Sequence, residues 1–337
     1  MSPMLQAMLL KDGQVVPLPA DFDAILSAWR QDPGCCLWLD VTAPDPATLA
    51  RLSREFRIHP AEVAATLNQD HRAQLVEHRE YFYLQLPVPA PPRRHEDPRR
   101  RLPTRPLDLI AGRRYLITLH QERLEVVDLT WSRFARGAEP QGVWPDLPVH
   151  SLCEAILQGY FPHLDRMEEE LERAERQVFG QEVGREPADS SQALERIFAI
   201  RRYLLGLRRT LAPLRDTFAS LARRDFPHLA PGSASLFAEL YSRTIRLLEV
   251  QENLREYTAG LVEAYLTVQN NRMNQIMKTL TVISTIMLPL TVITGFFGMN
   301  FTHIPGLHSP WGFWGATAFM VALGLGMLYV FRRRGWI

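Results

Sequence analysis

Two long stretches near the C-terminus constrain this chain more than any other feature, because they contain no Asp, Glu, Lys, Arg or His. They are residues 279–298, "TLTVISTIMLPLTVITGFFG", and residues 311–331, "WGFWGATAFMVALGLGMLYVF". Each has about 20 residues, the number that an α-helix needs to cross the hydrocarbon core of a bilayer. The sequence therefore predicts two transmembrane helices rather than two helices buried in a soluble core.

Charges beside these stretches predict the orientation of the chain. Arg272 and Lys278 precede the first stretch, three arginines at 332–334 follow the second, and residues 299–310 contain no Lys or Arg. Positive side chains near membrane helices are retained on the cytoplasmic side. We therefore expect a multi-pass protein of the inner (plasma) membrane, with both termini in the cytoplasm, an external loop at 299–310 and a basic cytoplasmic tail at 332–337.

The N-terminal part of the chain has a different character. In the whole sequence 38 Lys and Arg balance 37 Asp and Glu, which gives no case for a nucleic-acid partner. Residues 1–150 alternate strand-like and helix-like patterns, which indicates a cytoplasmic α/β domain. The predicted strands lie at 35–42, 81–88, 107–112 and 114–121, and a predicted helix lies at 44–56. The proline-rich residues 87–106 predict an irregular loop.

Helical patterns dominate after residue 150. Residues 151–232 predict a cytoplasmic helical hairpin, and residues 233–298 predict a stalk helix that continues into the first transmembrane helix. At 1.5 Å per residue, such a helix is on the order of 80 Å long before it reaches Pro289. Because it is too long for the interior of a small domain, we expect it to join the cytoplasmic domain to the membrane in an α+β membrane protein.

The long helix carries a stripe of polar and small residues. Steps of four and three residues connect Asn270, Asn274, Met277, Thr281, Ser284, Leu288, Thr291, Gly295 and Gly298 along one face. Small and hydroxyl residues also mediate dry helix packing in lipid. The stripe continues outside the membrane onto Asn274 and Asn270, which favours a wet face. One helix cannot enclose water, so a wet face implies several copies around an axis, with residues 311–331 on the lipid side.

These segments closely resemble the CorA-type divalent-cation channels. The likeness is carried by residues 265–301, "YLTVQNNRMNQIMKTLTVISTIMLPLTVITGFFGMNF", in which Gly-Met-Asn at 298–300 is the hallmark of the family. The basic end "MLYVFRRRGWI" at 327–337 is also similar to theirs. Further similar stretches follow in the expected order: "WLDVTAPD" at 38–45, "FRIHPAEV" at 56–63 and "RRYLLGLRRTLAPLRD" at 201–216.

The resemblance implies a funnel-shaped homopentamer in which five copies of the first membrane helix surround a pore. It implies that Gly298, Met299 and Asn300 form the selectivity filter, with Asn300 as a metal-binding residue. It places Asn274, Met277, Leu280, Leu288 and Thr291 along the pore, and the helical stripe adds Thr281, Ser284 and Gly295 to these pore residues. The implied function is Mg²⁺ uptake, with Co²⁺ and Ni²⁺ as further ions, down the electrochemical gradient. The implied partners are membrane lipid and divalent metal ions, with no resident cofactor and no enzymatic activity.

The regulatory residues of the family are only partly matched. Its members commonly sense internal Mg²⁺ between subunits through two acidic positions, and the first of these falls on Glu239. At the second position this chain has Ala64 and Ala65, with Glu62 one turn away. Regulation by bound Mg²⁺ through Glu239 is therefore an open expectation.

Two alternative functions stay open. The related ZntB-type transporters move Zn²⁺, with proton coupling as a further alternative, and their loops often contain the "IPG" found here at 304–306. His303 and His308 flank it, and imidazole suits Zn²⁺ better than Mg²⁺, although Met299 is atypical of that group. The more remote alternative is a soluble enzyme tethered to the membrane, but the sequence contains neither GxSxG nor HExxH.

Overall fold

We describe a computed structural model of the chain, which comprises two compact units, Met1–Leu261 and Val262–Ile337. The residues that the structure describes are 4–11, 14–67, 72–92, 102–137, 144–179, 190–223, 226–230, 232–299 and 311–336. The boundary between the units lies within one long helix, α8 (Ala234–Phe297).

The first unit is built on a seven-stranded sheet with the order β2-β1-β3-β7-β6-β5-β4. The strands are β1 (Met4–Lys11), β2 (Gln14–Leu18), β3 (Cys36–Thr42), β4 (Gln74–Glu77), β5 (Tyr81–Pro89), β6 (Thr104–Gly112) and β7 (Tyr115–His120). The central pair β3 and β7 is parallel, and every other pair is antiparallel. Both central strands are buried almost along their whole length, so layers of helix cover both faces of the sheet.

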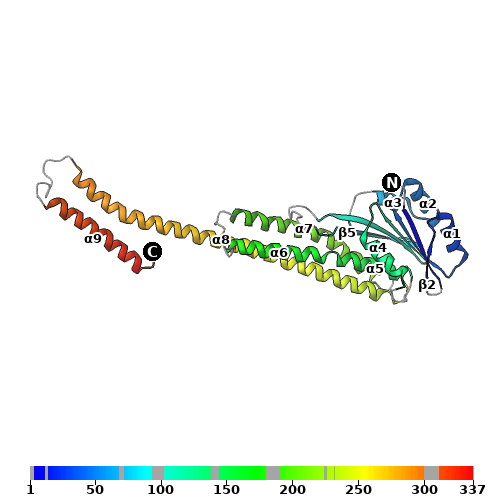
Figure 1. Ribbon diagram of the computed structural model, residues 1–337. Helices are drawn as coiled ribbons and strands as arrows, with labels where there is room; N and C mark the ends of the chain where they lie inside the picture. The colour runs from blue at the N-terminus through cyan, green and yellow to red at the C-terminus, as the bar shows by residue number, and fades with distance from the viewer. Residues whose placement is uncertain are drawn as a thin grey trace. The chain divides into compact units, whose positions relative to one another are not determined.

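Alternate residues of β3 show which helices cover each face. Leu37 and Leu39 are fully buried in one core together with residues of α1 (Phe22–Gln31) and α2 (Pro46–Phe56). Trp38 points to the opposite face, where its ring lies 4.9 Å from that of Trp131 on α4 (Glu125–Ala135). This alternation follows from the two-residue period of a strand. Figure 1 shows α1 and α2 on one side of the sheet and α4 with α5 (Asp146–Gln158) on the other.

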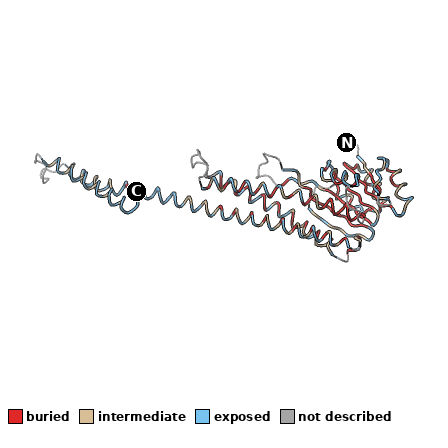
Figure 2. Tube along the Cα trace, turned by 60° about the horizontal axis from the view of Figure 1, so that its bottom comes forward, coloured by how far each residue is buried: buried red, intermediate tan, exposed pale blue. Residues whose placement is uncertain are grey.

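The long helices of the first unit pack side by side through an apolar seam. They are α6 (Phe161–Val178), α7 (Ser190–Leu221) and the first part of α8, and a shorter helix, α3 (Pro60–Leu67), follows α2. The buried residues of α8 recur at steps of three and four: Phe237, Leu240, Thr244, Leu247, Gln251, Leu254, Thr258 and Leu261. That spacing keeps one face of the helix against its neighbours. Figure 2 shows the buried residues of α8 giving way to exposed ones beyond this seam.

The second unit contains the rest of α8 and α9 (Gly312–Arg333). Both helices are long and apolar enough to span a membrane, with mean hydropathy of 2.0 and 1.7 over their most apolar windows. Only 6% of the first window and none of the second is buried within the chain. A core helix of a soluble protein would be mostly buried, so the exposure favours two membrane-spanning helices.

The structure confirms the four strands and the helix predicted in the α/β domain, and it corrects one prediction. The ends of the proline-rich stretch 87–106 are not irregular. β5 extends to Pro89 and β6 begins at Thr104, and Pro87 lies opposite Pro106 in the ladder between them. Residues 93–101 of that stretch lie outside the described residues. The division of the chain into six segments stays a prediction.

Candidate functional site

The stripe predicted from the sequence lies on one continuous helix. All of its predicted pore residues belong to α8, and all are exposed in the single chain: Asn274, Met277, Leu280, Thr281, Ser284, Leu288, Thr291 and Gly295. Leu288 is the most exposed large apolar residue among them, at 66%. No other described part of the chain covers this face. The polar members of the stripe therefore lie on a surface that lipid alone does not suit.

The opposite face of α8 is the one that turns toward α9. Val282 is buried, and Ile286 and Ile293 are half-buried, within about a quarter of a turn of it. Ser284 and Thr291 lie roughly half a turn away around the helix axis. Since α9 is the other described helix of this unit, the stripe faces away from it.

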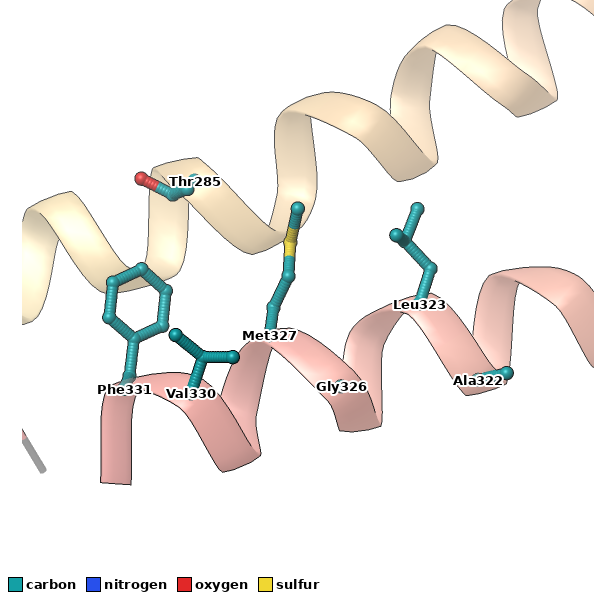
Figure 3. A pocket seen from close by; sticks show the side chains of 7 residues that line it. All are labelled: Thr285, Ala322, Leu323, Gly326, Met327, Val330 and Phe331. Carbon is teal, nitrogen blue, oxygen red and sulfur yellow. The ribbon is translucent and has the colours of Figure 1, made fainter. Parts of the chain in front are cut away.

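An apolar groove of about 490 Å³ marks the side where α8 and α9 approach each other. Figure 3 shows Met327 and Phe331 of α9 directed toward α8, near Thr285. The remaining lining residues are Ala322, Leu323, Gly326 and Val330. Thr285 is the only hydroxyl residue in this lining, and its Oγ1 donates to the backbone oxygen of Thr281 at 2.7 Å. The α9 side of the helix is thus apolar apart from this one hydroxyl.

Hydroxyl groups on the stripe face present hydrogen-bond acceptors. Thr281 Oγ1 donates to the backbone oxygen of Met277 at 2.7 Å, and Thr291 Oγ1 donates to that of Met287 at 2.9 Å. Because each hydroxyl proton is used within the helix, the lone pairs that remain can accept. A hydrated cation presents the hydrogens of its water shell, so these oxygens can bind it without removing that shell.

The C-terminal end of α8 is a second feature that favours the binding of a cation. The helix ends at Phe297, after which Gly298 N donates to Thr294 O at 2.9 Å and Met299 N to Phe296 O at 3.4 Å. Gly298 and Met299 are exposed there. The C-terminus of a helix carries about half a negative charge, which attracts cations. Asn300, the third predicted filter residue, and the loop histidines at 303 and 308 lie outside the described residues.

Glu239, the predicted regulatory residue, is already paired. Its Oε1 accepts from Arg243 Nη2 at 2.7 Å, and Arg243 Nη1 also reaches Glu154 Oε1 at 2.6 Å. The hydrogen bond with Glu239 is the main cause that raises the pKa of Arg243. Among the described residues, no group of three or more His, Cys, Asp or Glu side chains is placed to hold a metal ion. A metal at Glu239 therefore needs ligands from another copy and has to compete with Arg243.

Glu62, the nearest acidic residue to Ala64 and Ala65, is also engaged. The residue is 5% exposed, and its Oε2 accepts from Tyr81 OH at 3.2 Å. The other carboxylate oxygen lies 2.6 Å from His78 Nε2. Glu62 is therefore part of a buried polar cluster, and it is not poised to replace the acidic pair that the two alanines lack.

Comparison with known proteins shows which family has this sequence and fold. The family described as "CorA-like Mg2+ transporter protein" matches residues 35–333. The cobalt/magnesium transport protein CorA of Methanocaldococcus jannaschii is 28% identical and aligns over 98% of each chain. Its counterpart of the same name from Thermotoga maritima is 27% identical over 89% of this chain and 83% of its own. The solved structure of the complete M. jannaschii magnesium transporter has a TM-score of 0.78 at 24% identity, with 99% of each chain covered, which shows a common fold.

Zinc transporters are among the relatives as well. The zinc transport protein ZntB of Pectobacterium atrosepticum is 26% identical over 69% of this chain and 70% of its own. Two classes of transported ion therefore occur among the names of proteins similar to this one.

Proposed function

This chain belongs to the family of CorA-like Mg²⁺ transporter proteins, and from that premise we propose that it is a homopentameric channel for hydrated Mg²⁺. In general terms, its relatives make it a divalent metal ion transporter and not an enzyme, and it has two candidate membrane spans. The preference for Mg²⁺, with Co²⁺ and Ni²⁺ as further ions, the pentamer, and the cytoplasmic position of both termini are parts of the proposal.

The exposed stripe on α8 is the observation that carries the proposal. It faces away from α9, and residues such as Ser284 and Thr291 present polar atoms at membrane depth. Lipid has no donor for the acceptor positions that remain on these oxygens, and a single helix cannot enclose water. Rotational symmetry brings identical stripes together around one axis. Five copies then form a water-filled conduit whose outer wall is α9.

The chemistry of the stripe suits Mg²⁺ that keeps its water. Mg²⁺ loses its hydration shell reluctantly, so a conduit of neutral oxygens binds the ion through its waters. A ring of carboxylates would hold the ion more tightly and slow its release. A membrane potential of 100 mV contributes about 2.3 kcal/mol per charge, or about 4.6 kcal/mol for a divalent ion, which is roughly a thousandfold accumulation.

Zn²⁺ is the second candidate, because a ZntB protein is among the relatives. In that case His303 and His308 at the external loop supply imidazole ligands, which Zn²⁺ prefers. A transporter that couples Zn²⁺ entry to protons needs a pH gradient, whereas a passive Mg²⁺ channel needs only voltage.

Uptake into proteoliposomes separates these functions. We would reconstitute the full-length protein and measure initial rates for Mg²⁺, Co²⁺, Ni²⁺ and Zn²⁺, at a set K⁺ diffusion potential and with or without a pH gradient. The Mg²⁺ channel predicts uptake that follows voltage and ignores the pH gradient. Zn²⁺ uptake that requires the pH gradient, together with negligible Mg²⁺ flux, would replace the Mg²⁺ proposal by the zinc one. Absence of flux for all four ions would reject both.

A further inference from the structure

The groove between α8 and α9 is lined almost entirely by apolar side chains. Its volume of about 490 Å³ falls within the range of small-molecule sites, which is about 300–1,000 Å³. Thr285 is the only hydroxyl residue in the lining, and its proton is used within the helix, so the lining offers no free side-chain donor. Gly326 leaves the groove open, because a Cβ placed there would meet no atom within 4 Å. A polar ligand would lose hydrogen bonds to water there without replacing them.

The groove lies within the two candidate membrane spans, so the molecules that surround it are lipids. An aromatic contact marks one of its ends: the ring of Trp336 lies 5.7 Å from that of Phe331, a lining residue. Tryptophan is enriched where the hydrocarbon of the membrane meets the headgroups. The Phe331 end of the groove is therefore at headgroup depth.

Two cations continue the groove beyond its Phe331 end, one on each helix. Lys278 lies about two turns before Thr285 and within about 20° of it around the axis of α8. Arg334 lies about two turns after Met327 and within about 20° of it around the axis of α9, and its backbone N–H still makes a helical hydrogen bond, at 3.0 Å. Figure 3 shows Met327 directed toward α8 and Thr285 near Phe331, so both cations follow the groove to the same end.

Neither cation has a partner of opposite charge among the described residues. Lys278 and Arg334 are exposed and form no ion pair in that part of the chain. Glu263 is the last acidic residue of the sequence, and residues 264–337 contain five Lys and Arg and no Asp or Glu. A second copy of this segment would therefore bring more positive charge to the groove and no carboxylate side chain. This charge pattern favours an anion from outside the protein.

From these observations we propose that the groove binds an anionic membrane phospholipid. One acyl chain lies along the apolar lining, and the phosphate lies between Lys278 and Arg334 at the Phe331 end. The proposal rests on the two helices crossing a membrane, and it does not depend on which ion the protein carries or on the number of copies in the assembly.

The headgroup supplies the specificity of this site. Lipid chains are as apolar as the side chains of the groove, so a chain gains little when it leaves other lipids to enter it. A phosphate between two cations gains charge-assisted hydrogen bonds, and basic pockets between membrane helices bind anionic headgroups. A zwitterionic lipid carries its own cation close to the phosphate, and that cation competes with Lys278 and Arg334. Phosphatidylglycerol, which has no such cation, should therefore bind more tightly than phosphatidylcholine.

Native mass spectrometry of the full-length protein in detergent tests the site. Phosphatidylglycerol and phosphatidylcholine with identical acyl chains are titrated separately, and the bound fraction gives a dissociation constant for each lipid. The test variants are Lys278→Gln and Arg334→Gln. The matched controls are Arg272→Gln and Arg332→Gln, which remove the same charge from exposed positions of the same helices, about 120° and about 160° around the axis from the test positions.

A second pair of variants tests the groove itself. Gly326→Leu places a side chain in the groove, and Gly315→Leu adds the same side chain to α9 outside the lining. A Cβ at either glycine would meet no atom within 4 Å, so neither substitution requires the backbone to move. Thermal melting of every variant checks that it folds as the wild type does, and the mass spectra also report the number of copies in each.

We expect the wild type to bind phosphatidylglycerol about fivefold more tightly than phosphatidylcholine, or better. Lys278→Gln and Arg334→Gln should each weaken phosphatidylglycerol binding about fivefold, and the two arginine controls should change it less than about twofold. Gly326→Leu should weaken the binding of both lipids at least about threefold, because its side chain takes the place of the acyl chain, and Gly315→Leu should not.

Equal dissociation constants of the wild type for the two lipids would overturn the proposal, and so would test variants that bind phosphatidylglycerol as their controls do. If Gly326→Leu alters the number of copies and leaves lipid binding unchanged, the groove takes a second copy of the chain and the proposal fails. No ion flux is measured, so a negative result here leaves the proposed transport function standing, and a failure of that function leaves this site standing.

Discussion

Arg243 and Glu239 lie one turn apart on α8 and are joined by a hydrogen bond of 2.7 Å between Nη2 and Oε1. Arg243 also reaches Glu154 on α5 at 2.6 Å, so one guanidinium bridges two carboxylates. This relationship bears directly on regulation, because a metal ion at Glu239 has to displace Arg243 or share the carboxylate with it.

Internal Mg²⁺ should have little effect on uptake by the wild-type protein. Glu239 forms an ion pair with Arg243, and Ala64 and Ala65 contribute no carboxylate at the other regulatory position. We expect millimolar Mg²⁺ inside proteoliposomes to change the initial rate by less than about twofold. Ala65→Asp should increase the inhibition, and the uncharged Ala65→Asn serves as its control. Strong inhibition of the wild type that Glu239→Gln abolishes would contradict this prediction.

Two threonines of α8 provide a matched test of the wet face. Thr291 lies on the stripe and Thr285 lines the groove beside α9, and both hydroxyls donate to the backbone four residues earlier. Thr291→Val should lower Mg²⁺ uptake about tenfold, because it removes an acceptor from the conduit. Thr285→Val should leave uptake within about twofold of the wild type. Equal effects of the two variants in proteoliposomes would mean that the stripe is not the ion pathway.

Chemical labelling tests the same geometry without relying on a change in polarity. A cysteine at Ser284 faces the stripe, whereas one at Ile293 lies on the side of Val282 and α9. A cationic, water-soluble thiol reagent should react with Ser284→Cys and block uptake, and it should leave Ile293→Cys active. The wild type is the control for the three native free cysteines, of which Cys35 and Cys153 are buried. Fast modification at 293 with none at 284 would reverse the assignment of the faces.

A buried ion pair in the α/β domain predicts how stability depends on pH. His120 Nε2 lies 3.0 Å from Asp40 Oδ1. Burial opposes the protonation of His120, but the hydrogen bond and the charge of Asp40 outweigh it, and the pKa of His120 is raised. Protonated His120 therefore adds stability below its ordinary pKa of about 6.5, and that stability is lost as the pH rises through the higher folded value.

The melting temperature of the full-length protein should accordingly fall by a few degrees between about pH 6 and about pH 8.5. Asp40→Asn should flatten this part of the profile, and Glu125→Gln, at an exposed position of α4, should not. Circular dichroism of the three proteins across this range is the measurement. A wild-type profile that is flat, or one that rises with pH, would show that the pair does not favour the protonated histidine.

Secondary structure was predictable from the sequence where the local pattern is strong. The stretches at 35–42 and 81–88 are mostly apolar and aromatic, and the structure places β3 and β5 there. β1, β2 and β4 were missed. β2 contains Pro17, and β4 has only four residues. These segments become strands because a neighbouring strand pairs with them, as when Met8 lies opposite Trp38, and no local pattern reports that pairing.

Strand pairing also explains why the proline-rich residues 87–106 differ from the prediction of an irregular loop. Proline is unfavourable inside a strand because it has no N–H to donate, so a stretch rich in it was expected to be irregular. In the structure Pro87 and Pro106 face each other near the end of the β5–β6 ladder. Neighbours such as Leu86 and Leu107 are buried in the sheet, and their burial outweighs the lost donors.

The sequence by itself determined the two apolar helices, their lengths and the period of the stripe on α8, because bilayer thickness and helical pitch act on consecutive residues. Only the tertiary structure decided which side of α8 turns toward α9, that Arg243 bridges Glu239 and Glu154, and that Lys278 and Arg334 lie beyond the same end of one groove. Those relationships join residues from distant parts of the chain, and they depend on packing, for which local periodicity carries no information.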